Sequence, residues 1–299
     1  MLVSLLGAAL VALAPAQDTD TTVSVQRGAR LTLENYAGEV TIRTWDRGAV
    51  RIQAGHSARD EVEIDVSPGS VRIEGHGRHG APRPIDYVLT VPAWMPVAVE
   101  GVYTDVVIEG TQAEVNVETV GGDVRVRGGS GYVALSSVEG AVRLERARGR
   151  VALNSVNEGV YLADVEGQVA VTAVNGDVTL ERVRSDHVEV ETVNGDVWFD
   201  GAIRRGGGYR FATHNGDVTV VVPDGTGADV SVDTFNGEFE SDFPVQLTES
   251  RRKRFRFTLG GGGARVELQS FQGEIRLARP GAARRDTGGK AKSKREHEN

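Results

Sequence analysis

The chain has 299 residues, a formal net charge of −8 and no cysteine. The acidic balance argues against general nucleic-acid binding, and the lack of cysteine excludes disulfides, thiol chemistry and a lipid-anchoring cysteine. Hydrophobic residues make up 39% of the chain, which is enough for a substantial core. The 38 glycines, the many valines and the scarcity of helical patterns predict an all-β protein of short strands and tight turns.

The first residues predict a secretory signal peptide. In MLVSLLGAALVALAPAQ, an apolar run of about a dozen residues is too short to span a bilayer comfortably. It ends at Ala14-Pro15-Ala16, a small-x-small cleavage site. We therefore expect residues 1–16 to be removed. The mature chain has no second apolar segment of about 20 residues, so we expect a secreted, periplasmic or cell-surface protein that is not integral to a membrane.

Residues 22–96 resemble the later repeat only in part. The repeat unit occurs at Leu31/Val40 and at Val62/Val71, but the pattern blurs between Trp45 and Pro96. Residues 76–99 hold four of the nine prolines, and because proline cannot donate to a β-ladder we expect an irregular loop there. The sequence leaves open whether residues 22–96 are the first coils or a separate N-terminal lobe.

Residues 97–279 repeat with a period of 18, as TAVNGDVTLERV and ETVNGDVWFDG illustrate. Each repeat contains two apolar segments and two turns, one of them usually Asn-Gly-Asp. Columns of like residues indicate coils that stack about 4.8 Å apart. The sequence therefore predicts a β-solenoid, similar to a parallel β-helix, with two strands per coil. The alternative is an antiparallel meander of Asn-Gly hairpins, which does not require matching columns.

Period 2 within the strands predicts which side chains fill the core. The inward set is Val124, Val126, Val142, Leu144, Val160, Leu162, Val178, Leu180, Val197 and Phe199 from one sheet, and Val115, Val117, Val133, Leu135, Val151, Leu153, Val169, Val171, Val188 and Val190 from the other. A column of small residues should lie at a corner, with its hydroxyl groups bonded to backbone: Thr119, Ser137, Ser155, Ala173, Thr192, Thr213, Thr234 and Ser270. An apolar column follows it directly: Val120, Val138, Val156, Val174, Val193, His214, Phe235 and Phe271.

The C-terminal residues predict an end to the stack and a tail. RRKRFRFTL alternates charges with apolar residues and suits a cap against edge-to-edge pairing, which we place around residues 251–277. Residues 280–299 are basic and polar, and we expect a disordered tail.

The ordered segments LTLENYAGEVTIRTWDRGAVRI, YVLTVPAWMPVAVEGVYTDVVIEG and the serial TVNGDV units resemble the bacterial DUF4097 family, whose members carry the name "putative adhesin". The resemblance covers about residues 22–279. It implies an extracytoplasmic β-repeat domain with no established catalytic residues. Related members linked to envelope-stress signalling leave a sensor or regulator role open.

The acids after each turn glycine raise the questions of metal binding and of catalysis. They are Asp123, Asp177, Asp196, Asp217, Glu238 and Glu274. A row of carboxylates could hold calcium, but the G-G-x-G-x-D pattern of calcium β-rolls is absent, and turn chemistry explains a residue repeated in every coil. We therefore predict no metal, no cofactor and no enzyme, with a carbohydrate-active lyase or hydrolase as the alternative.

The outward positions of the Asn-Gly-Asp sheet suggest a binding surface. The candidate stripe is Arg125, Arg143, Tyr161 and Trp198, whose guanidinium groups and rings suit anionic chains or sugars. On the opposite sheet, Ala134, Ala152 and Ala170 form a second outward row. The sequence thus predicts a non-enzymatic, adhesin-like binding or scaffold protein of the bacterial envelope, with a polysaccharide or another surface protein as partner.

Overall fold

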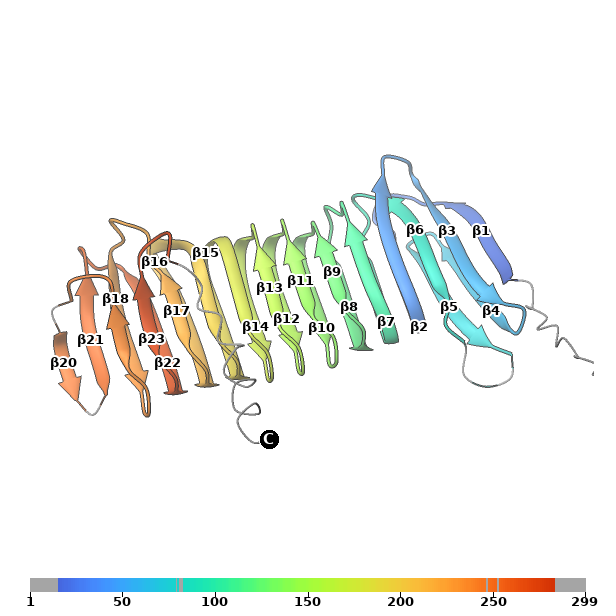
Figure 1. The fold of residues 1–299 in the computed structure, drawn as a ribbon. Helices are drawn as coiled ribbons and strands as arrows, with labels where there is room; N and C mark the ends of the chain where they lie inside the picture. Colours follow the sequence, from blue (N-terminus) through green and yellow to red (C-terminus); the bar gives the residue numbers. More distant parts are fainter. Residues whose placement is uncertain (1–15, 79, 81–82, 246, 252, 283–299) are drawn as a thin grey trace, which may run out of the picture.

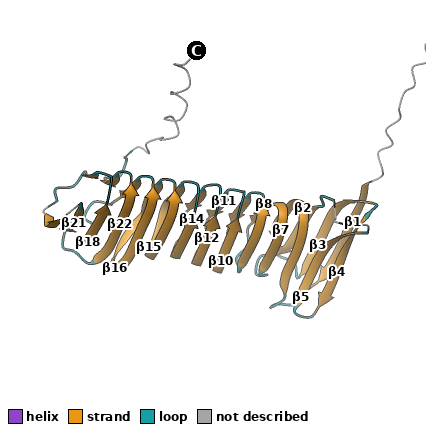
Figure 2. Cartoon of the chain, turned by 90° about the horizontal axis from the view of Figure 1, so that it is seen from below, coloured by secondary structure: helices purple, strands orange, loops and turns teal. Residues whose placement is uncertain are grey.

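The computed structural model describes residues 16–78, 80, 83–245, 247–251 and 253–282. The predicted signal peptide thus falls outside the described residues except at residue 16, and so does the predicted tail beyond residue 282. The described chain is an elongated stack of strands in two facing layers (Figures 1 and 2). Within these ranges no helix is long and apolar enough to cross a membrane.

The strands form two layers, each continuous through the pairing of its neighbours, and four long strands turn the corner from one layer to the other: β2 (Arg30–Trp45), β7 (Val97–Glu109), β15 (Val178–Asn194) and β16 (Val197–Asn215). Sheet I contains, in spatial order, β4 (Asp60–Ser67), β5 (Ser70–Gly77), the first half of β2, the first half of β7, β8 (Val115–Gly121), β10 (Ser130–Ser137), β12 (Arg148–Ser155), β14 (Glu166–Ala173), the second half of β15, the second half of β16, β22 (Ala264–Gln272), β18 (Ala228–Thr234), β21 (Arg254–Leu259) and β20 (Leu247–Arg251).

Sheet II contains, in the same direction, β1 (Ala16–Ser24), β3 (Ala49–Ser57), β6 (Asp86–Pro92), the second halves of β2 and β7, β9 (Val124–Arg127), β11 (Val142–Glu145), β13 (Val160–Ala163), the first halves of β15 and β16, β17 (Val218–Val221), β23 (Ile275–Ala278) and β19 (Phe239–Ser241).

The pairing of the central strands is parallel and follows the repeat. Val133 of β10 pairs with Val151 of β12, and Val142 of β11 pairs with Val160 of β13, each 18 residues further along the chain. A hairpin meander would give antiparallel neighbours, so the β-solenoid prediction is confirmed and the meander is excluded for these coils.

The core lies between the two sheets and contains every side chain of the predicted inward set. Val197 and Phe199, for example, are 1% and 0% exposed. Burying a side chain of this size stabilises the fold by about 1.5–3 kcal/mol relative to leaving it in water. The stack therefore derives its stability from a continuous apolar interior that each coil shares with its neighbours.

The buried Ser/Thr column has the predicted structural role. Ser137 Oγ donates to the carbonyl oxygen of Gly122 at 2.9 Å, and Thr213 Oγ1 donates to that of Gly195 at 3.0 Å. These hydroxyl groups connect each coil to the turn of the preceding one. The turn glycines are required by the same stacking, because a Cβ on Gly195 would lie 2.2 Å from the carbonyl oxygen of Gly176.

At the N-terminal end β2 stacks in register on β7, with Leu31 paired to Val97 and Val40 paired to Val106. Beyond β2 the outermost pairs are antiparallel: β3 with β1 and β6, and β4 with β5. Among the described residues, the expected irregular loop is reduced to residues 78, 80, 83–85 and 93–96, because residues 86–92 form strand β6. Pro92 is tolerated there since it occupies the last position of that strand.

At the C-terminal end the coils are not stacked in chain order. β22 pairs with β16 on one side and with β18 on the other, so the last coil of the chain lies inside the stack. Residues 264–277 of the predicted cap therefore belong to an internal coil. The end of sheet I is the antiparallel pair β20–β21, with Phe257 buried against the core. The fold allows this order because coils with matching columns are interchangeable neighbours.

Candidate binding surface

The structure brings the predicted stripe together on sheet II. Arg125, Arg143 and Tyr161 occupy paired positions on the adjacent strands β9, β11 and β13. Trp198 lies two strands beyond Tyr161, with Thr179 between them. Four steps of about 4.8 Å give the stripe a length of about 19 Å. Whether it binds a ligand stays a prediction.

The stripe residues interact with one another and with flanking acids. The guanidinium carbon of Arg143 lies 4.2 Å from the centre of the Tyr161 ring, a cation–π contact. Arg125 pairs with Asp123 at 2.5 Å and Arg143 with Glu145 at 3.6 Å. Burial and a hydrogen bond to Glu181 raise the pKa of the Tyr161 phenol, so the hydroxyl remains a donor at neutral pH. Exposed ion pairs of this kind contribute about 0–1 kcal/mol, so a ligand could replace them.

The acid column has a structural role in the turns. Asp177 Oδ1 accepts a hydrogen bond from the backbone N–H of Asp196 at 2.9 Å, and Asp196 Oδ1 accepts one from Asp217 at 2.8 Å. The series continues to Glu274, whose N–H donates to Asp217 at 2.7 Å. Each carboxylate thus joins two coils. Among the described residues, no group of three or more His, Asp or Glu side chains is placed to hold a metal ion.

We expect the thermal midpoint to be the same, within a few degrees, in chelator and in millimolar calcium, because backbone N–H groups already occupy these carboxylates. A calcium site filled at 100 times its dissociation constant would add about 2.7 kcal/mol, which raises the midpoint by about 5 °C or more. Circular dichroism melts in the two buffers measure the difference. A calcium-dependent rise of that size would make Asp177, Asp196 and Asp217 ligands.

A second surface runs along the corner between the Ser/Thr column and the Asn-Gly-Asp turns. We call the column that follows the Ser/Thr column the corner ridge. In spatial order it consists of Val120, Val138, Val156, Val174, Val193, His214, Phe271 and Phe235. Five of its eight positions are valine, and the three nearest the C-terminal end of the stack are rings. His214 stacks on Phe271 with ring centres 4.6 Å apart, and Phe271 stacks on Phe235 at 4.8 Å. Phe235, the end of this ring stack, is 63% exposed.

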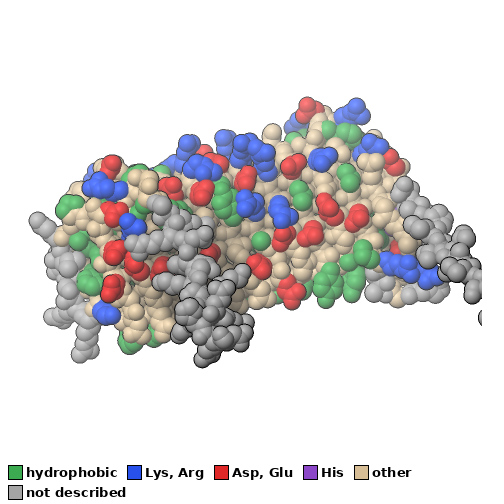
Figure 3. Space-filling model, in the orientation of Figure 1, with side chains coloured by type: hydrophobic (Ala, Val, Ile, Leu, Met, Phe, Trp, Pro, Cys, Tyr) green, Lys and Arg blue, Asp and Glu red, His purple; other side chains and the backbone are tan. Residues whose placement is uncertain are grey.

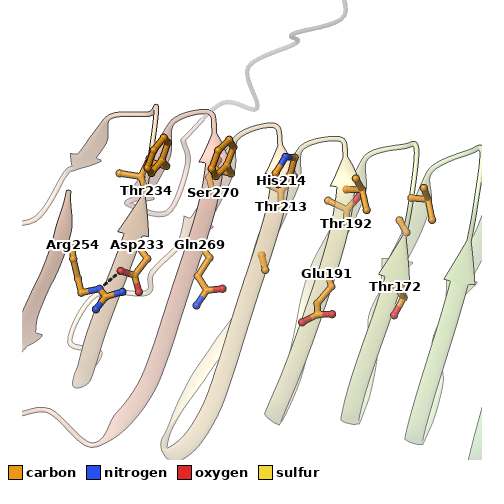
Figure 4. Close-up of a pocket in the computed structure, with 16 residues that line it drawn as sticks. Thr172, Glu191, Thr192, Thr213, His214, Asp233, Thr234, Arg254, Gln269 and Ser270 are labelled. Atoms are coloured by element: carbon orange, nitrogen blue, oxygen red, sulfur yellow. Dashed lines mark hydrogen bonds and ion pairs between the residues drawn. The ribbon is translucent and has the colours of Figure 1, made fainter. Parts of the chain in front are cut away.

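Beside the ring stack, sheet I is hollowed into a groove of about 900 Å³. It crosses β14, β15, β16, β22 and β18, with the corner ridge along one side (Figure 4). Glu191, Gln269 and Asp233 lie lower on the same face, and Arg254 of β21 pairs with Asp233 at the end of the groove. Ala212 lies between Glu191 and Gln269 and leaves the floor open there.

Charged side chains are distributed unevenly over the molecule. Lys and Arg side chains gather along the upper edge of its middle part, and Asp and Glu side chains are spread over the surface below (Figure 3). In the groove each of the two acids, Glu191 and Asp233, has an arginine beside it. Arg210 donates to Glu191 at 3.3 Å and to Gln269 Oε1 at 3.2 Å, while Arg254 neutralises Asp233.

The sequence shows the corner ridge as an apolar column but predicts no role for it, and nothing in the local pattern points to Glu191, Gln269, Asp233 or Arg254. A signal was present, because the ridge changes from valine to aromatic rings in its last coils. The contact between the three rings could not be predicted, because the coils at this end are not stacked in chain order. Only the insertion of β22 between β16 and β18 brings Phe271 between His214 and Phe235.

These features define a parallel two-sheet β-solenoid with long outward rows of side chains. The family described as Toastrack DUF4097 matches residues 15–278, and the chain belongs to this family. No curated protein sequence matches the chain.

Solved structures of bacterial proteins are similar to the chain at low identity. A "putative adhesin" from Bacteroides fragilis is 11% identical with a TM-score of 0.45, over 88% of this chain and 98% of the other. A "putative cell adhesion protein" from Clostridium sporogenes is 9% identical with a TM-score of 0.27, over 89% and 100% of the two chains. At these identities and TM-scores the likeness supports no conclusion about function.

Proposed function

We propose that this chain is a non-enzymatic, extracytoplasmic binding protein of the bacterial envelope, adhesin-like in its action. Its stripe of Arg125, Arg143, Tyr161 and Trp198 contacts an extended acidic polymer of the envelope. The observation that carries the proposal is the register of the stripe. Because these side chains repeat along the solenoid axis, a polymer laid along that axis meets one of them at nearly every coil.

The chemistry of the stripe favours an acidic partner. Arginine forms fork-like hydrogen bonds with carboxylate or phosphate groups. Arg125 and Arg143 hold only one acid each among the ion pairs of the described residues, and both side chains are about half exposed. A polymer carboxylate or phosphate can therefore compete with Asp123 and Glu145. Tyr161 and Trp198 add flat apolar surface beside the charges.

The geometry of the groove argues against the alternative of a glycoside hydrolase. Such enzymes place two carboxyl groups about 5–9.5 Å apart across the scissile bond. Glu191 and Asp233 face the groove from β15 and β18, which are three strand spacings apart, or about 14 Å. An assay for reducing or unsaturated sugar ends on a polysaccharide panel should therefore remain at background.

We expect binding to an acidic polymer, with polygalacturonate and poly(glycerol phosphate) as probes, to weaken about tenfold or more in the Arg125→Ala/Arg143→Ala protein, because charge-assisted pairs are lost. Binding should also weaken with added salt, which screens exposed charges. Biolayer interferometry on immobilised polymer measures both effects.

The matched control is Arg148→Ala/Arg150→Ala, which removes two exposed arginines from β12 of sheet I. This control should bind like the unmodified protein. If the stripe variant, melting normally, bound both polymers undiminished, the stripe would not be the site.

A further inference from the structure

The stacked rings of His214, Phe271 and Phe235 are larger side chains than the fold requires at this corner position. In five coils the same corner position is filled by valine, and those coils stack with the same parallel register. His214, Phe271 and Phe235 therefore place aromatic surface in water where valine would serve the fold. Exposed aromatic groups beside a hollow are a signature of ligand contact. Parallel rings with centres 4.6 and 4.8 Å apart leave the outer face of Phe235 open.

We propose that the groove beside this ring stack binds an extended neutral glycan that lies along the solenoid axis. One sugar ring would rest its apolar face on the open outer face of Phe235, and the rest of the glycan would lie along the ring edges of Phe271 and His214. The hydroxyl groups would turn to the floor, where Gln269, Glu191 and Asp233 offer hydrogen-bonding atoms. This site lies on sheet I, away from the arginine stripe, and it depends on the proposed function only in that the chain is a binding protein.

The charged groups of the groove disfavour an anionic ligand, which a neutral glycan is not. Glu191 is paired with Arg210, and Asp233 is paired with Arg254. The side-chain oxygen of Gln269 accepts from Arg210, and among the described residues its amide nitrogen has no protein partner, so it can donate to sugar oxygens. An anionic polymer would find no unpaired cation in these groups, because Arg210 also lies 3.9 Å from Glu189 and 3.6 Å from Glu267 and Arg254 is paired with Asp233.

The spacing of the coils favours a sugar chain over a peptide. Each coil adds about 4.8 Å along the axis, close to the length of one pyranose unit, whereas an extended peptide advances about 3.3 Å per residue. A peptide that binds by strand addition also needs backbone partners from a free strand edge. The groove crosses β15, β16 and β22, which are paired on both sides. The backbone groups of these strands are therefore used by their neighbours, and the groove offers the ligand side chains, which can form hydrogen bonds with sugar hydroxyl groups.

The test measures binding of cellohexaose and chitohexaose by isothermal titration calorimetry, with the full chain and two variants. Phe235→Val/Phe271→Val installs the residue that the ridge carries in other coils, so it should fold, and it should weaken binding about tenfold or more because the apolar platform is lost. Gln269→Ala keeps the rings and removes a donor, and it should weaken binding several-fold. The affinity of the unmodified protein should stay constant between low and high salt, because the ligand is uncharged.

The stripe variants separate this site from the acidic-polymer site. Arg125→Ala/Arg143→Ala and Tyr161→Ala/Trp198→Ala should bind the hexasaccharides like the unmodified protein, and the ring variant should still bind polygalacturonate. The proposal is overturned if no hexasaccharide binds, if the ring variant and Gln269→Ala both bind undiminished, or if the stripe variants alone lose binding. It is also overturned if sedimentation shows a dimer that the ring variant dissociates, because a second copy would then cover the groove.

Discussion

Replacing Val197 with Asp should destabilise the protein by about 5 kcal/mol or prevent folding, because it buries a charge with no partner. Val197 is 1% exposed and lies in register between Val178 and Val218, so every neighbour along the stack is apolar. Urea unfolding followed by circular dichroism measures the loss. Coils that share one core should transmit this damage beyond a single repeat.

The matched control is Trp198→Ala, one residue further along the same strand. Its side chain points outward, so its loss should change the free energy of unfolding by at most about 1 kcal/mol. Equal destabilisation by the two substitutions would show that the inward and outward sides of β16 have been assigned incorrectly.

Gly167→Ala should cost more than about 3 kcal/mol. The Cβ of alanine would lie 2.0 Å from the carbonyl oxygen of Gly149, an atom fixed in the parallel ladder, and the backbone φ of Gly167 is +128°, which side chains other than glycine rarely adopt. Relief would require β14 to move away from β12. We expect a lower midpoint in both urea and thermal unfolding.

Gly208→Ala provides the comparison for this substitution. The nearest atom to its Cβ would be His187 Nδ1 at 3.7 Å, and its φ lies outside the left-handed region. The change should be within about 1 kcal/mol and could be stabilising, because alanine restricts the unfolded chain. A Gly167→Ala protein as stable as Gly208→Ala would contradict the close packing of the coils.

The binding surfaces differ in how far local pattern could predict them. Arg125, Arg143 and Tyr161 follow at steps of 18 residues, so stacking alone places them side by side. The groove combines Glu191 of β15 with Gln269 of β22, Asp233 of β18 and Arg254 of β21. No fixed spacing in the sequence relates these four residues, because the chain passes through β17 to β21 before β22 returns between β16 and β18.

The sequence alone determined the internal structure of each coil. A period of 18 with alternating apolar residues sets two strands per coil, the inward side chains and the hydroxyl column, because these depend on the strand repeat and on contact between identical positions. Tertiary structure decided the order of the coils and how each end is closed. Val230 and Val266 both carry the same repeat signal, and either coil could pack next to Tyr209. The choice rests on the antiparallel pairing of β21 with β18, a long-range contact that occupies the outer side of β18 and leaves the place beside β16 to β22.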